Sequence, residues 1–200
     1  MRPKSSIPGS PLAKAVDRLI QRNSRLDPVA DLYTSATEAV SGSGLGPTLR
    51  GDWLGHALHP LLTDFPLGCW SSAALLDVVG GTAGRPFARR LIGAGLVASV
   101  PTALAGAAEW PDLVNRSTKR VAAVHASGNV AVVILYFWSW RLRHGGKHAG
   151  GVLIGMVAGC LALITGYLGG HLSFAWGIGH GERGQTAPAQ QDQPDPSLDR

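Results

Sequence analysis

The middle of the chain contains four long apolar stretches separated by short polar connections. Each stretch is roughly 20 residues long, near the length that crosses ~30 Å of hydrocarbon as a helix rising 1.5 Å per residue. The stretches run from about Pro60 to Val79, Leu91 to Trp110, Val121 to Trp140 and Gly151 to His171. They lack the charged stripe at helical period that is typical of a soluble bundle. The pattern therefore predicts four membrane-spanning helices, because a backbone in lipid must satisfy its own hydrogen bonds.

The connections between the stretches are short, and short connections join helices that run antiparallel. Two stretches also carry small residues at four-residue spacing, which lets helix backbones approach closely in lipid. These residues are Ala94, Ala98, Thr102 and Gly106 in the second stretch and Gly151, Gly155 and Gly159 in the fourth. We find no internal sequence repeat. The predicted fold class is all-α, an integral membrane four-helix up-down bundle.

Shorter amphipathic patterns precede the bundle and complete the predicted fold as N-terminal amphipathic helices. Ser10-Pro11 and Asp27-Pro28 each place proline where a first helical turn accepts it, and apolar residues follow at helical spacing. Both segments are too polar to span, so we expect them to lie on the membrane surface or cover the bundle. The alternative is that they are solvated helices. The chain thus divides into a polar N-terminal region (1–50), a transmembrane domain (51–179) and a disordered polar tail (180–200).

Composition excludes some functions. The 200 residues carry a formal net charge of +5, which suits basic residues that flank membrane helices and face anionic lipid. No nucleic-acid or hydrolase motif is present. Cys69 and Cys160 lie within apolar stretches, and no Cys-x-x-Cys pair exists to hold an iron–sulfur cluster or attach a c-type haem. No apolar segment follows the N-terminal charges, so we expect no cleaved signal peptide.

The antiparallel order places most of the histidines at one face of the membrane. This face receives the start of the first and third stretches and the end of the second and fourth. The polar residues that map to it are His56, His59, Asp64, Glu109, His125 and His171. The position of Asp64 in a first helical turn would be explained by the helix dipole alone. The position of Glu109 would be explained if its carboxylate extends to water beside Trp110. His144 and His148 map to the opposite face.

Histidine within a membrane helix is uncommon and usually has a function. His125 lies inside the third stretch, and Gly128 leaves room for a flat cofactor beside it. Gly169 and Gly170 do the same beside His171. Neutral imidazole is a natural ligand of haem iron, zinc and copper. We therefore predict haem b or another metal, with His125 and His171 as the preferred ligands and His59 as the third candidate. The alternative is that these histidines only hydrogen-bond to carbonyls or to each other.

Two segments carry distinctive sequences, WLGHALHPLLTDFPLGCW from Trp53 to Trp70 and GYLGGHL from Gly166 to Leu172. Both resemble segments of an uncharacterised bacterial membrane family, domain-of-unknown-function family 2231, and the resemblance extends over roughly residues 51–179. It implies a four-helix membrane module. The matching positions are His59, Asp64, Pro66 and Gly68 in the first segment and Gly169, Gly170 and His171 in the second. Some members of that family are joined to a Rieske-type iron–sulfur domain, which implies electron transfer but names no reaction.

Three hypotheses of function follow. The leading one is a redox-associated membrane module that binds haem b or another metal, with the lipid bilayer and a Rieske-type or other redox protein as partners and no nucleic acid. The second is a cofactor-free scaffold or partner subunit with structural histidines. The third is a small transporter or proton path through Asp64, Glu109 and His125, which the lack of charge at mid-membrane disfavours. An even number of spans places both termini on one side of the cell membrane, and we expect that side to be cytoplasmic.

Overall fold

The computed structural model describes residues 11–175, and their regular elements are all helical, with no β-strand among them. The N-terminal helices are α1 (Pro11–Val16), α2 (Asp27–Ser41) and α3 (Gly46–Arg50). The long helices are α4 (Leu58–Val79), α5 (Gly81–Ala108), α6 (Arg116–His144) and α7 (His148–Gly170). Short 3-10 or π turns are η1 (Asp17–Gln21), η2 (Ser24–Leu26), η3 (Asp52–Leu54), η4 (Trp110–Asp112) and η5 (His171–Ala175). The all-α prediction is confirmed for this part of the chain, and the predicted tail at 180–200 lies outside it.

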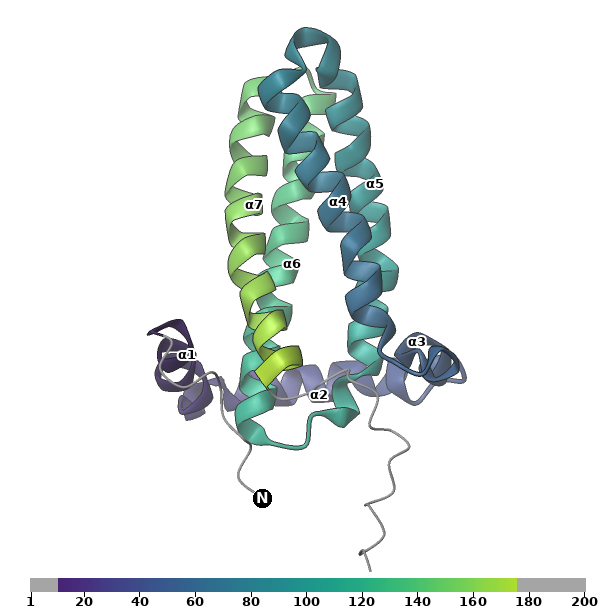
Figure 1. Ribbon diagram of the computed structural model, residues 1–200, viewed down its shortest axis with the longest axis vertical. Coiled ribbons are helices and arrows are strands. Elements are labelled where there is room, and N and C mark those ends of the chain that lie inside the picture. Colours follow the sequence, from purple (N-terminus) through teal and green to yellow (C-terminus); the bar gives the residue numbers. More distant parts are fainter. Residues whose placement is uncertain (1–10, 176–200) are drawn as a thin grey trace, which may run out of the picture.

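The four long helices form two antiparallel hairpins that pack side by side (Figure 1). One hairpin is α4–α5, which turns at Gly80, and the other is α6–α7, which turns at residues 145–147. Both turns lie at the same end of the molecule, which we call the turn end. Gly81 and Gly146 have φ angles of +52° and +78°, and glycine adopts this backbone conformation without the steric cost that a side chain would add. The helices α1, α2 and α3 lie across the opposite end, which we call the layer end (Figure 1).

Three helical segments in the described part of the chain are long and apolar enough to cross a membrane. They are Gly81–Asp112, Arg116–His144 and His148–Ser173. The first stretch of the sequence forms α4, but α4 does not reach the same apolarity. Its 22 residues include Asp64 and Asp77. Membrane-spanning helices are therefore supported for three of the four predicted stretches.

The helix α5 begins at Gly81, ten residues before the predicted start of its apolar stretch. Arg85, Arg89 and Arg90 interrupt the apolar pattern there, yet the backbone remains helical through them. Helical hydrogen bonds join backbone groups and do not require apolar side chains. Apolarity thus predicts the part of a helix that can enter lipid, and it does not predict the full length of that helix.

The N-terminal helices pack onto the bundle and share a hydrophobic core with it. Val16 and Ala30 are buried together with residues of α6, α7 and η4. Tyr33 of α2 stacks on Trp110 with ring centroids 5.6 Å apart, and the Trp110 indole Nε1 donates a hydrogen bond to Thr34 Oγ1 at 2.9 Å. Of the two predicted arrangements for these amphipathic helices, the structure therefore contains the one in which they cover the bundle.

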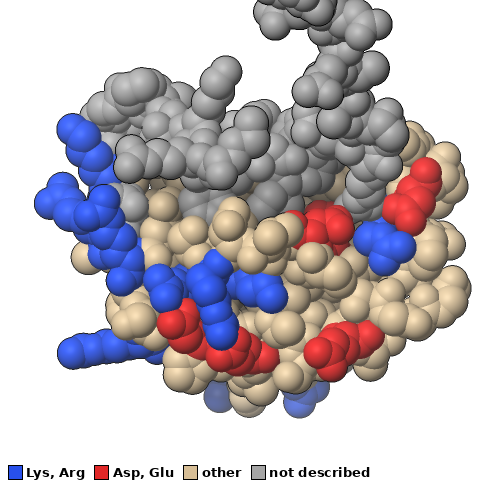
Figure 2. Space-filling model, turned by 90° about the horizontal axis from the view of Figure 1, so that it is seen from below, with Lys and Arg blue, Asp and Glu red and all other residues tan. Residues whose placement is uncertain are grey.

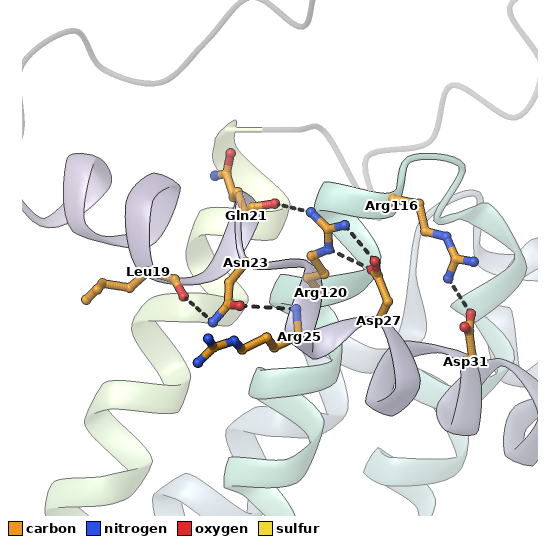
Figure 3. Close-up of polar contacts among 8 residues, drawn as sticks. All are labelled: Leu19, Gln21, Asn23, Arg25, Asp27, Asp31, Arg116 and Arg120. Atoms are coloured by element: carbon orange, nitrogen blue, oxygen red, sulfur yellow. Dashed lines mark hydrogen bonds and ion pairs between the residues drawn. The ribbon is translucent and has the colours of Figure 1, made fainter.

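Ion pairs fasten this layer to the start of α6 (Figure 3). Arg120 donates to both carboxylate oxygens of Asp27, at 2.7 and 2.8 Å, and to the carbonyl oxygen of Gln21 at 2.7 Å. Arg116 forms a single, more exposed contact, in which its Nη1 donates to Asp31 Oδ1. The hydrogen bond from Arg120, together with its charge, lowers the pKa of the Asp27 carboxyl. Seen from the layer end, basic side chains gather along one edge of the molecule with acidic ones beside them (Figure 2).

Candidate functional site

The predicted polar cluster contains two histidines that lie against one another. His59 is in the first turn of α4 and His125 is in the third turn of α6, so they belong to different hairpins. Their ring centroids are 6.3 Å apart and their planes meet at 86°. Packing of the two hairpins therefore creates a pair of facing imidazoles toward the layer end.

The imidazole of His59 is tethered to α5. Its Nδ1 donates a hydrogen bond to the carbonyl oxygen of Thr102 at 2.8 Å. Gly106 makes room for the ring, because a Cβ at that position would come within 3.0 Å of His59 Nδ1. The predicted site residue Glu109 is 8% exposed, and its Oε1 accepts a hydrogen bond from the backbone N–H of His59 at 3.4 Å. A carboxylate in this position stabilises the positive end of the α4 dipole.

The imidazole of His125 is tethered to α7 by an equivalent set of contacts. Its Nδ1 donates to the carbonyl oxygen of Thr165 at 2.8 Å, and a Cβ at Gly169 would come within 2.8 Å of His125 Cε1. Asn129 adds a contact that His59 lacks, because its Nδ2 lies 3.1 Å from His125 Nε2. The Asn129 Oδ1 accepts a hydrogen bond from Thr165 Oγ1 at 3.1 Å. A carbonyl oxygen only accepts, so Nδ1 of both histidines carries a proton, and in the neutral imidazole the lone pair is then on Nε2.

The two tethers are one structure repeated in the two hairpins. The corresponding pairs are His59 and His125, Thr102 and Thr165, and Gly106 and Gly169. Each residue of α4 corresponds to the residue of α6 66 positions later, and each residue of α5 to the residue of α7 63 positions later. Buried positions obey the same rule, as in Ala73 and Ser139, Ala88 and Gly151, Gly95 and Ala158, and Ala105 and Leu168. The structure therefore contains a repeat that the sequence analysis did not find.

Two further pairs of corresponding residues join the hairpins nearer the turn end. Trp70 and Tyr136 stack with ring centroids 4.1 Å apart and an interplanar angle of 16°. Asp77 and Arg143 form an ion pair, and both side chains are almost completely buried. Three pairs of corresponding residues thus meet across the contact between the hairpins, and the histidine pair is the one at the predicted face.

The structure places His171 apart from this pair, at the end of α7. Gln21 Nε2 donates a hydrogen bond to His171 Nε2 at 3.3 Å, which connects the N-terminal layer to η5. The His171 ring also stacks on Tyr167 with centroids 6.3 Å apart. Gly170 is the last residue of α7 and directly precedes it. The imidazole that faces His125 is therefore that of His59, the third candidate of the sequence analysis.

The remaining predicted residues also have defined places. His56 is exposed before α4, and its Nδ1 donates to the carbonyl oxygen of Ala57 at 3.1 Å. Asp64 is exposed on α4. Gly128 was predicted to leave room for a flat cofactor, but a Cβ there would lie 2.3 Å from Thr165 Cγ2. The space beside Gly128 is thus filled by the methyl group of Thr165. Within residues 11–175, no three His, Cys, Asp or Glu side chains are placed to hold a metal ion together.

Comparison with known families agrees with this architecture. Residues 55–182 match the model of a family described as a predicted membrane protein, DUF2231. The chain belongs to this family. The resemblance seen in the sequence is therefore confirmed, and this DUF2231 chain is an integral membrane protein. No curated protein and no solved structure matches it.

Sequence reasoning missed the residues that position the histidines of this DUF2231 chain. Thr102 and Thr165 act mainly through backbone carbonyls, which no side-chain motif reveals. One signal was available in the sequence. Asp77 lies eighteen residues after His59, and Arg143 lies eighteen residues after His125, so opposite charges stand at equal distances from the two histidines.

Proposed function

We propose that this chain is a four-span membrane module that holds a transition metal ion between His59 and His125 and serves a redox process in the membrane. The observation that supports the proposal is the hydrogen bond that Nδ1 of each ring makes to a backbone carbonyl. Each Nδ1–H is donated to a carbonyl at 2.8 Å, so each Nε2 carries the lone pair that a metal requires. Metal-binding histidines characteristically donate their other ring N–H in this way.

The spacing of the rings suits a single ion. Imidazole nitrogens bind zinc at about 2.0–2.1 Å, and iron, copper and nickel also accept imidazole ligands. An ion at that distance from one nitrogen of each ring fits between rings whose centroids are 6.3 Å apart. For His125 to bind it, the Asn129 amide would turn away from Nε2. Two protein ligands leave positions on the ion for atoms of another molecule, which is the chemistry that the ion would supply.

The packing favours an ion over haem b. A macrocycle needs an open slot beside its ligands, and Thr165 fills the space beside Gly128. The spaces at Gly106 and Gly169 are filled by the two imidazoles themselves. Haem b binding would therefore require the hairpins to move apart.

A second candidate function is a cofactor-free membrane scaffold or partner subunit with structural histidines. The contact between Asn129 Nδ2 and His125 Nε2 specifically favours it, because that contact satisfies the second nitrogen of the ring. On this proposal each histidine only joins the helices of its own hairpin. Such hydrogen bonds between membrane helices stabilise them by about 0.6 kcal/mol each on average.

Asparagine substitutions distinguish the two candidates. The amide N–H of asparagine replaces the Nδ1–H donor of histidine, whereas the Nε2 ligand is lost. Purified protein, expressed with added haem and with added metals, is analysed for metal content and for haem absorption. We expect His59→Asn and His125→Asn to keep the thermal stability of the parent protein and to lose the bound metal. His144→Asn, which changes a histidine at the turn end, should keep the bound metal.

The opposite results would overturn the metal proposal. A parent protein that carries neither metal nor haem would leave the cofactor-free candidate. A Soret band in the parent that both asparagine variants lose would show that haem b is the group bound.

The proposal includes α4 as the fourth span. Its 22 residues extend about 33 Å at 1.5 Å per residue, enough to cross the hydrocarbon layer. One of its carboxylates, Asp77, is neutralised by Arg143. Four spans place the two termini on the same side, which we propose to be cytoplasmic. A Rieske-type or other redox protein would be the partner of the metal form.

A further inference from the structure

A cavity of about 200 Å³ lies between α4 and α7 near the turn end. It is lined mainly by apolar side chains, and Tyr136 and the Asp77–Arg143 pair supply its polar atoms. Val78 and Met156 line it and are 83% and 63% exposed, so the cavity opens on the outer surface of the helices. In a membrane this surface faces lipid. A molecule dissolved in the bilayer could therefore enter without crossing the protein.

The structural repeat explains why the cavity exists. Ala74 of α4 corresponds to Trp140 of α6, and Met156 of α7 corresponds to Gly93 of α5. Between α5 and α6 the indole of Trp140 packs over Gly93, with Nε1 3.1 Å from where a Cβ would lie. Between α4 and α7, the corresponding residue is Ala74, which has no ring. The cavity is thus at the place where the other half of the repeat has an indole.

One polar group of the cavity lining is the hydroxyl of Tyr136. Tyr136 is 5% exposed, stacks on Trp70 and lines the cavity, and its hydroxyl makes no hydrogen bond within residues 11–175. Asp77 accepts from Arg143, and Arg143 also donates to Ser139, so both charged groups are already engaged within the protein. No fully buried side-chain nitrogen or oxygen of the described residues lacks a partner, so the Tyr136 hydroxyl remains accessible from the cavity and can donate to an atom of a bound ligand.

We propose that this cavity binds a planar ring system of about the size of an indole, carried by a lipid-soluble molecule that presents a hydrogen-bond acceptor to Tyr136. The size agrees with the volume, because an apolar cavity of about 150 Å³ holds benzene and a larger one accommodates a second fused ring. The acceptor complements the Tyr136 hydroxyl that lines the cavity. The ligand enters from the bilayer between α4 and α7, at the opposite end of the bundle from the two histidines.

The test uses coumarin, a planar bicyclic compound with a carbonyl group, and naphthalene, which has a similar shape and no acceptor. Each is titrated by calorimetry into the full chain in detergent. We expect saturable binding of coumarin at one site per chain. Ala74→Trp should weaken it at least tenfold by restoring the missing indole. Val97→Trp, which adds the same side chain at a position that is 75% exposed on α5, should leave it unchanged.

Tyr136→Phe separates shape from hydrogen bonding. It should weaken coumarin binding several-fold and leave naphthalene binding unchanged. If Ala74→Trp does not fold, Ala74→Leu fills part of the same space and should still weaken binding. The proposal is overturned if the parent chain shows no saturable binding, or if a folded Ala74 variant binds coumarin as the parent does.

Discussion

Asp77 and Arg143 hold corresponding positions in the two hairpins, and they form a two-point ion pair with both N–O distances at 2.6 Å. Their side chains are 8% and 2% exposed. Arg143 Nε also donates to Ser139 Oγ at 3.2 Å, and Ser139 in turn donates to the carbonyl oxygen of Gly151 at 2.6 Å. A single charge pair therefore connects α4 to both helices of the other hairpin.

Loss of one partner in this pair should be costly. Removing one member of a buried ion pair typically costs about 3–5 kcal/mol, because the other charge stays buried without compensation. We expect Asp77→Ala and Arg143→Ala each to lower the thermal unfolding midpoint in detergent strongly. The double exchange Asp77→Arg with Arg143→Asp should recover part of the loss, since the two positions are equivalent in the repeat. Single variants as stable as the parent would show that the pair does not hold the hairpins together.

The glycines that seat the histidines should not tolerate a methyl group. At Gly169 an added Cβ would lie 2.8 Å from His125 Cε1. Overpacking of this kind costs about 1–3 kcal/mol, so Gly169→Ala should lower the unfolding midpoint. Gly166→Ala on the same helix is the matched control, because nothing lies within 4 Å of its added Cβ. The control should be neutral or slightly stabilising, since alanine favours helix over glycine. Equal effects of the two variants would contradict the seating of His125 at Gly169.

The Asp27–Arg120 pair predicts a dependence of stability on pH. The pKa of Asp27 is lowered in the folded protein by the hydrogen bond from Arg120. The contribution of the Asp27–Arg120 pair to the free energy of unfolding is therefore fully present above the ordinary aspartate pKa of about 3.9. It is lost as the pH falls through the lower pKa that Asp27 has in the folded protein. Asp27→Asn should unfold at a lower temperature than the parent at pH 7, and the two should converge as the pH is lowered toward 3. Thermal scans across this range measure the difference.

The exposed Glu38 of α2 provides the control for that series. Glu38→Gln should follow the parent curve at every pH, because no ion pair is recorded for Glu38 among the described residues. A gap between Asp27→Asn and the parent that stays constant with pH would show that ionisation of Asp27 does not fasten the layer.

The number of spans predicts where two reporter fusions lie. If α4 crosses the membrane with the other three long helices, fusions after Arg50 and after Gly181 should report the same compartment. If α4 lies along the surface, three spans remain and the two fusions should report opposite compartments. Paired phosphatase and fluorescent-protein reporters distinguish these outcomes, and a fusion within residues 145–147 should report the side opposite to the C-terminal one in either case.

Much of the fold could be predicted because long apolar stretches are a local property of the chain. The observed helices α6 and α7 enclose or nearly coincide with the stretches predicted at Val121–Trp140 and Gly151–His171. The prediction that several histidines lie at one face followed from their positions along the apolar stretches and from the antiparallel order of consecutive helices. The approach of His59 to His125 could not be predicted, because it depends on how each helix is rotated about its axis. That rotation is determined by packing along the whole helix.

The helical structure, the entry into a membrane and the family of this protein could all be inferred from the residue types along the chain. These properties depend on residue types over short distances along the chain. A long apolar stretch enters lipid, and in lipid it must be helical so that its backbone groups hydrogen-bond to one another. The packing of the helices was needed to show which imidazoles face each other, that Thr165 fills the space beside Gly128, and that the two hairpins repeat one structure. Contacts between helices depend on backbone carbonyls, on the space beside glycines and on the shapes of side chains, and no short stretch of sequence reveals these. Corresponding positions of the two hairpins can therefore carry different side chains and still contact each other. Trp70 and Tyr136 do so by stacking, and Asp77 and Arg143 do so as an ion pair.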